Sequence, residues 1–216
     1  MNRLKSLDPP HKGLRNALGQ LTLLAGKTDY TSKASLENLQ ALGKEVFSLL
    51  KDHTYTENTY ILAPLEKRNP GFIEDYLRDH DEIDKLEDDL HDQLFSFDGK
   101  QSNDDGHQFY LDLCDFQSAY LEHIDVEDVE LEEEMQKHFT DEELMGHQIE
   151  IMQFMSFEML LLWFKYIVPA RRADENAQVL TGFKSAAPAE AYAAVLNTIK
   201  QEISESEMNE ILSLVK

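Results

Sequence analysis

Apolar residues recur every three or four positions along most of the chain, a spacing typical of amphipathic helices. No stretch keeps the strict alternation of apolar and polar residues that a half-buried strand shows. Glycine and proline are scarce, at 9 and 6 of 216 residues, and they coincide with interruptions of the pattern. The pattern predicts helices over about 9–25, 32–67, 72–95, 106–138, 140–168 and 188–203, and a last helix that begins after residue 204.

Signals at the helix ends support this division. Asp8 precedes two prolines, which predicts that it caps the first helix. Thr140 and Glu143 have the spacing of a capping box and should open the fifth helix. The expected fold class is therefore all-α: an up-down four-helix bundle over residues 8–138, with a C-terminal helical extension over residues 139–216 packed on it.

Polar side chains continue two of the apolar stripes. In the second predicted helix the stripe passes through His53 and Glu57 before it returns to apolar residues, and in the fourth it passes through His123 and Glu127. Residues four apart share one face of a helix, about one turn apart. Each of these two helices should therefore direct an imidazole and a carboxylate into the bundle.

The first and third predicted helices add one inward histidine each. His11 begins a stripe of leucines, and His80 lies on a stripe with Ile73, Leu77 and Ile83. Neighbouring helices of an up-down bundle run in opposite directions, and each residue advances 1.5 Å along its helix. The spacing from each histidine to the nearest turn is similar within each pair of helices, so the four imidazoles should lie at comparable depth.

Four buried imidazoles and two buried carboxylates need compensation, because an unpaired buried charge costs several kcal/mol. One form of compensation is hydrogen bonding among these groups, and the other is a metal. A nitrogen-rich set with two carboxylates suits iron, zinc or manganese better than calcium or magnesium. Side chains on facing helices of a bundle can hold two such ions.

The same residues resemble the hemerythrin-like (HHE cation-binding) proteins over about residues 8–145. The resemblance lies in single histidines on the first and third helices and in two His-xxx-Glu motifs on the second and fourth. It implies a non-haem centre of two iron ions, or of another transition metal in their place. The implied ligands are His11, His53, Glu57, His80, His123 and Glu127, with the two glutamates as bridging carboxylates.

The chain departs from the oxygen-carrying members, which have a second histidine one turn away on the third helix. Here the turn before His80 holds Tyr76 and the turn after it holds Asp84. Either could supply a seventh ligand, or neither does. The resemblance is therefore closer to the iron- and oxygen-sensing members than to the oxygen carriers.

Composition limits the partners and the location. With 20 basic and 42 acidic residues, the chain carries a formal charge of −22. This charge argues against nucleic acid and against anionic membrane surfaces, but it is compatible with cations. A single cysteine, Cys114, excludes an internal disulfide. The most apolar stretch, residues 151–168, contains charged residues and is unlike a spanning helix, and no signal peptide is evident, so we expect a cytoplasmic protein.

Three functions fit these observations. The leading one is a metal-binding protein that binds O2 or a similar small ligand, or senses iron or oxygen, in a pocket walled by Leu14, Ile61, Leu77 and Ile83. A di-iron oxidase, peroxidase or nitric-oxide-handling enzyme could use the same ligands. An acidic helical interaction protein without metal is the third. Self-association through a helix over residues 149–168 is a further expectation.

Overall fold

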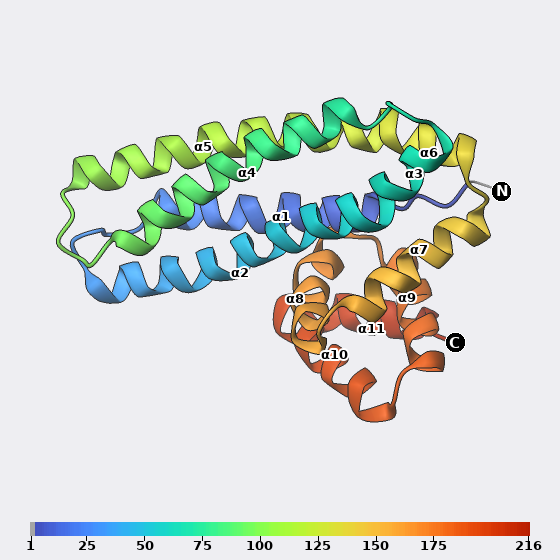
Figure 1. The fold of residues 1–216 in the computed structure, drawn as a ribbon. Coiled ribbons are helices and arrows are strands. Elements are labelled where there is room, and N and C mark those ends of the chain that lie inside the picture. Colours follow the sequence, from blue (N-terminus) through green and yellow to red (C-terminus); the bar gives the residue numbers. More distant parts are fainter. Residues whose placement is uncertain (1–2) are drawn as a thin grey trace.

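The computed structural model describes residues 3–216, and within that range the chain is helical with no strand. The predicted all-α fold is confirmed: four long helical segments form an elongated up-down bundle, and further helices form a smaller unit against one side of it (Figure 1). The bundle comprises α1 (Asp8–Ala25), α2 (Lys33–Glu57), η1 (Asn58–Leu62), α3 (Ala63–Arg68), α4 (Glu74–Ser96), α5 (Asn103–Val126), η2 (Glu127–Leu131) and α6 (Glu132–His138).

Two of the four bundle segments are interrupted by a π-helical turn. The segments η1 and η2 follow α2 and α5 with no intervening loop, and α3 and α6 follow them in the same way. The sequence pattern predicted one uninterrupted helix in each place. The bundle thus consists of two helix pairs: the first pair is α1 with α2, and the second pair is α4 with α5, each including the π-helical segment that follows.

The two helix pairs place their inward residues in the same register. His53 and His123 are 70 positions apart, as are Glu57 and Glu127, and the inward residues of α4 follow those of α1 by 69 positions. Both pairs therefore bury the same pattern at the same depth. The buried stripe of α1 contains His11, Leu14, Leu18, Leu21 and Ala25, and that of α4 contains His80, Ile83, Glu87, Leu90 and Leu94.

The observed helix ends correct one predicted cap. Asp8 is the first residue of α1 rather than its N-cap, which is Leu7, and no side chain caps this end. Serines instead cap the two helices that carry the His-xxx-Glu motifs. The Ser32 hydroxyl accepts a hydrogen bond from the Ser35 amide, and Ser102 forms a capping box with Asp105, so α5 begins three residues earlier than predicted.

The predicted helix over 140–168 is wrong as a single element. Thr140 opens α7 (Asp141–Phe154) with the expected capping box, but the chain then turns at Met155 and Ser156. Because Ser156 caps a new helix, the 149–168 segment is not one continuous helix. The remaining elements are α8 (Phe157–Ile167), η3 (Val168–Ala170), α9 (Ala173–Ala186), which the pattern did not predict, α10 (Ala189–Glu202) and α11 (Glu205–Leu214).

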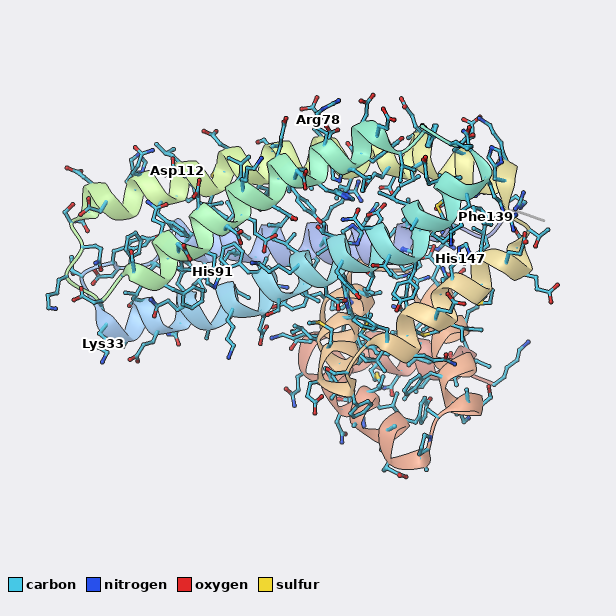
Figure 2. The ribbon with its side chains drawn as sticks, viewed as in Figure 1. Lys33, Arg78, His91, Asp112, Phe139 and His147 are labelled. Atoms are coloured by element: carbon cyan, nitrogen blue, oxygen red, sulfur yellow. The ribbon has the colours of Figure 1, made fainter. Side chains whose placement is uncertain are left out.

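The C-terminal helices have an apolar core of their own, formed among others by Phe164, Leu180 and Ile199. The helix α8 also packs against α1 and α2, so that Trp163 and Tyr166 belong to the core of the bundle (Figure 1). Unlike these two buried side chains, Arg78 and Asp112 point outward from the second helix pair (Figure 2). Among residues 3–216, no helix has both the length and the apolarity that crossing a bilayer requires.

Candidate metal centre

The structure brings all six predicted side chains together in the middle of the bundle. Each of them is at most 9% exposed, and each of the four long segments contributes at least one. They form two groups that share one carboxylate, and within each group the potential ligand atoms lie within 4.8 Å of one another. The first group is His11, His53, Glu57 and Glu127, and the second group is His80, His123 and Glu127.

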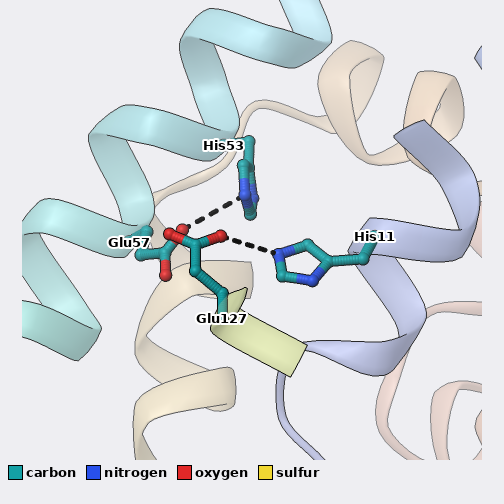
Figure 3. Close-up of side chains that lie close together, drawn as sticks. All are labelled: His11, His53, Glu57 and Glu127. Carbon is teal, nitrogen blue, oxygen red and sulfur yellow. Dashed lines mark ion pairs between the residues drawn. The ribbon is translucent and has the colours of Figure 1, made fainter. Parts of the chain in front are cut away.

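The first group joins α1 and α2 to the start of η2 (Figure 3). His53 Nε2 lies 3.1 Å from Glu57 Oε2, one turn along the same helix. His11 Nε2 faces Glu127 Oε2 across the bundle at 3.5 Å. The two imidazole rings meet edge to face with centroids 5.0 Å apart. Two nitrogen atoms and two carboxylates therefore converge on one small volume.

The second group lies on the other side of Glu127. Its Oε1 atom is 2.9 Å from His123 Nε2 and 3.2 Å from His80 Nε2. Glu57 Oε2 also reaches to 4.0 Å from His80 Nε2. Glu127 thus directs one carboxylate oxygen to each group, and the Glu57 carboxylate lies between the two groups. This arrangement of nitrogen and oxygen atoms suits the binding of a metal cation.

Several of these atoms have no hydrogen-bond partner among the described residues, although they are buried. They are His11 Nε2, His53 Nε2, both carboxylate oxygens of Glu57 and Glu127 Oε2. His53 Nε2 and Glu57 Oε2 are close enough for a hydrogen bond, but their relative orientation does not allow one. Native structures rarely leave buried polar atoms unpaired. These nitrogen and oxygen lone pairs point toward one another with no hydrogen bond between them, which is the arrangement that a cation requires. The residues therefore fit a metal.

Two hydrogen bonds behind the centre orient its histidines. Asp128 Oδ1 is 2.8 Å from His11 Nδ1, and Asn58 Oδ1 is 2.8 Å from His80 Nδ1. Arg15 in turn donates to Asp128 at 2.9 Å. When Nδ1 carries the hydrogen, Nε2 presents a free lone pair to the centre. The sequence prediction missed Asn58 and Asp128, although each directly follows a predicted glutamate ligand.

The π-helical segments explain how two consecutive residues can both contribute to the metal centre. Consecutive residues of a regular α-helix point about 100° apart, and a π turn inserts an extra residue that shifts this phase. The segment η1 begins at Asn58, directly after Glu57, and η2 begins at Glu127, directly before Asp128. At both places the glutamate faces the centre and the next residue bonds a histidine from a neighbouring helix. The unusual backbone thus coincides with the densest polar contacts of the interior.

Sequence comparison agrees with this geometry. The sequence profile of the hemerythrin HHE cation binding domain matches residues 2–132, which is more than half of the chain. The chain belongs to the hemerythrin HHE cation-binding domain family. No curated protein and no solved structure was found to match. The family assignment therefore rests on the bundle sequence, and the match ends at the first residue of α6.

Within this hemerythrin HHE domain, the charges of the centre are mutually stabilising. Burial alone would raise the pKa of Glu127, but the imidazoles of His123 and His80 beside it outweigh burial and lower the pKa well below its usual value. For His11, burial would lower the pKa, but the hydrogen bond to Asp128 and the charges of Glu127 and Glu57 raise it. The Glu127 carboxylate therefore stays ionised, and its negative charge favours a cation placed beside it.

The two candidates for a seventh ligand have different surroundings. Asp84 is half-buried and belongs to neither group, and its pKa is raised chiefly by burial. Tyr76 is buried in the apolar cluster next to the centre, so it is not a surface residue. Burial and then the charges of nearby glutamates raise its pKa to about 12, which keeps its phenol neutral. A ligand role for Tyr76 stays a prediction.

One predicted wall of the pocket is wrong. Leu14, Ile61 and Ile83 are buried as expected, but Leu77 is 39% exposed. The inward phase of α4 runs from Ile73 through Tyr76 to His80, so Leu77 falls about 100° away from it. Tyr76 occupies the interior place that the prediction gave to Leu77.

The remaining histidines lie outside both groups. His107 is exposed, His138 pairs with Glu134 at 2.9 Å, and His91 contacts the Phe47 ring. His147, on α7, packs edge to face on Phe139, with ring centroids 4.9 Å apart (Figure 2). None of them approaches the centre, so the chain contains matched controls for histidine substitutions.

Two buried glutamates were also missed by the sequence prediction. Glu132 accepts hydrogen bonds from the backbone amides of Ser6 and Leu7, at 2.9 and 3.0 Å, and so ties the N-terminal segment to α6. Glu87 is 1% exposed, and its Oε1 has no partner among the described residues. Burial raises the pKa of Glu87 to about 8. The acidic composition hid both residues, because in such a chain most glutamates lie in solvent.

Proposed function

We propose that this protein holds two iron ions in the first and second groups and uses them to bind O2 or a similar small ligand, or to sense iron or oxygen. The observation that carries the proposal is the convergence of six buried side chains in two groups, with one shared carboxylate and several unpaired lone pairs. Membership of a cation-binding family supports the same conclusion.

The donor set favours iron over the hard cations. Four imidazoles and two carboxylates suit Fe, Mn or Zn, whereas Mg²⁺ and Ca²⁺ prefer oxygen ligands. When bound, a pair of iron ions supplies the redox chemistry and the open coordination positions that O2 requires. The chain contributes orientation through Asp128 and Asn58, and buried apolar walls from Leu14, Ile61 and Ile83 that keep water away.

Iron stoichiometry tests the metal part of the proposal. After anaerobic reconstitution with Fe²⁺ and removal of excess metal, we expect about two iron ions per chain by elemental analysis. His53→Ala and His123→Ala should each lose iron, because each removes one imidazole from a different group. His147→Ala is the matched control, since His147 packs on Phe139 away from the centre. Wild-type protein with less than one iron per chain would refute the proposal.

Exposure to O2 tests the small-ligand part. The reconstituted Fe²⁺ protein should develop an absorption band in the near-ultraviolet or visible range on admission of O2 or nitric oxide. The variants that lose iron should not develop it, whereas His147→Ala should. An iron-loaded protein whose spectrum responds to neither gas would leave metal binding in place but exclude gas binding.

A further inference from the structure

One contact connects the C-terminal helices to the candidate metal centre. The indole Nε1 of Trp163, on α8, donates a hydrogen bond to Asp52 Oδ2 at 2.8 Å. The Trp163 ring meets the His53 ring edge to face, with centroids 6.5 Å apart. Asp52 directly precedes His53 on α2. The same side chain thus contacts a candidate ligand and is held by the residue next to it.

A second set of contacts joins the end of α8 to α1, the helix that carries His11. Gly13 lies two residues after His11 on α1, and a Cβ atom there would be 2.8 Å from Ile167 Cγ1. Any larger residue at position 13 would therefore force Ile167 to shift, and glycine lets α8 lie this close to α1. Asn16 Nδ2 also donates to the carbonyl of Tyr166 at 3.0 Å. The helix α8 therefore contacts His53 directly through Trp163, and it packs on the helix of His11 through Gly13 and Asn16.

The second group has different neighbours. The rings of His80 and His123 contact each other, with centroids 4.8 Å apart, and the next ring beside His123 is that of Tyr120 at 6.3 Å. These contacts all come from the bundle itself. Among the described ring contacts of the four histidines, only that of His53 involves a side chain of α8, so the second group serves as an internal comparison.

We propose that Trp163 is a positioning residue of the first group, and that its contacts with His53 and Asp52 and cation binding at this group stabilise each other. This inference rests on the proposed function, because it requires a cation at the first group. A cation bound to His53 would hold its imidazole in one orientation, and Trp163 packs against that imidazole. Coupling between two sites is reciprocal: whatever the Trp163 contacts add to cation affinity, the cation adds to the stability of these contacts.

Affinity measurements on the full-length chain test the coupling, with Mn²⁺ as an air-stable probe. Trp163→Phe removes the N–H donor without a change of charge, and Asp52→Ala removes the acceptor. Both should weaken Mn²⁺ binding by about tenfold in calorimetric titrations, which is the effect typical of residues that orient metal ligands. Asp52→Asn keeps an oxygen acceptor for the indole and should bind within twofold of wild type. If the carboxylate acted through its charge alone, Asp52→Asn would be as weak as Asp52→Ala.

Glu45→Ala is the matched control. Glu45 lies two turns from Asp52 on α2 and also holds α8, because it accepts hydrogen bonds from Lys165 Nζ and Tyr166 Oη, both at 2.6 Å. This variant loses docking contacts that do not touch a histidine of the centre. It should therefore bind Mn²⁺ within about twofold of wild type.

Hydrogen exchange measures the reciprocal effect. Mn²⁺ should slow amide exchange in α8 of the wild-type protein, and this protection should shrink in Trp163→Phe. Equal Mn²⁺ affinities of wild type, Trp163→Phe and Asp52→Ala, with no change of exchange in α8, would overturn the coupling while the metal site itself stood. Wild-type protein that binds neither Mn²⁺ nor Fe²⁺ would overturn the proposed function and the coupling together.

Discussion

The two helix pairs of the bundle have the same inward register but different interiors. At the candidate metal centre they correspond residue by residue: His11 with His80, His53 with His123, and Glu57 with Glu127. Away from the centre the first pair is apolar where the second is polar. Leu18 corresponds to Glu87, and Leu50 corresponds to Tyr120, and all four side chains are buried.

This difference shows that packing alone does not determine the second pair. Leucine fits the same depth in the first pair, so the bundle geometry does not require a carboxyl or a phenol there. Glu87 Oε1 and the Tyr120 hydroxyl have no partner among the described residues, and burial raises the pKa of both groups. Unpaired buried polar groups cost about 1–3 kcal/mol each. The first pair therefore represents the more stable solution to the same packing problem.

The largest expected effect concerns the shared carboxylate. Glu127 faces both groups, whereas Glu57 belongs to the first group and reaches only one histidine of the second, at 4.0 Å. Glu127→Gln should therefore weaken the binding of both cations by about 100-fold or more. This loss exceeds the one caused by removing a residue that only orients a metal ligand. Glu57→Gln should chiefly weaken the binding of the cation in the first group. Calorimetric titration with Mn²⁺ would resolve the two binding events, and equal losses in both variants would contradict the asymmetry.

The second largest expected effect concerns the residues that orient the histidines, which differ between the two helix pairs. His11 is oriented by the carboxylate of Asp128, and His80 by the neutral amide of Asn58. We expect Asp128→Ala to lower cation affinity by about 10–100-fold, and Asn58→Ala by less, because a charged partner holds an imidazole more strongly. Asp125→Ala is the control: Asp125 also pairs with Arg15, at 2.5 Å, but contacts no histidine of the centre. An affinity loss in Asp125→Ala would show that charge alone is responsible.

A substitution that copies the first pair into the second should change stability rather than affinity. Glu87→Leu removes a buried carboxyl and should stabilise the cation-free protein by about 1–3 kcal/mol in urea unfolding at pH 7. The variant Leu18→Ile provides the comparison for a change of shape alone at the equivalent depth. A destabilised Glu87→Leu would mean that Glu87 has a partner which its surroundings do not reveal.

The same residue predicts a pH dependence. Burial raises the pKa of Glu87 from 4.5 to about 8, so between these values the folded chain binds one proton more than the unfolded chain. Its contribution to stability must therefore fall as the pH rises through this window, by at most about 1.4 kcal/mol per pH unit, and level off above pH 8. The neighbouring charges of Lys51, Asp84 and Asp88 modify the slope. The difference in unfolding free energy between wild type and Glu87→Leu, measured at pH 5 and pH 8, should widen at pH 8.

The sequence predicted the inward histidines and glutamates because they continue apolar stripes at helical spacing, which is a property of single helices. It missed Asn58 and Asp128 because only a π turn brings them inward, and no local pattern announces that turn. Glu87 lies between Ile83 and Leu90 at the same spacing, but an acidic helix offers too many exposed carboxylates to single it out. The break at Ser156 was missed because no glycine or proline marks it.

The smallest expected effect tests whether the pairs also differ at the end remote from the centre. Ser32 and Ser102 are 70 positions apart and cap α2 and α5. Ser32 accepts one amide hydrogen bond at 3.4 Å, whereas Ser102 accepts one at 3.1 Å and its own amide donates to Asp105 at 2.9 Å. Ser102→Ala should therefore cost about 1 kcal/mol in urea unfolding and Ser32→Ala about 0.5 kcal/mol. Neither should alter Mn²⁺ affinity, because each cap lies 21 residues from the histidine on its helix. A change of affinity in either would show that the far end of the bundle adjusts the centre, and the two pairs could then no longer be compared site by site.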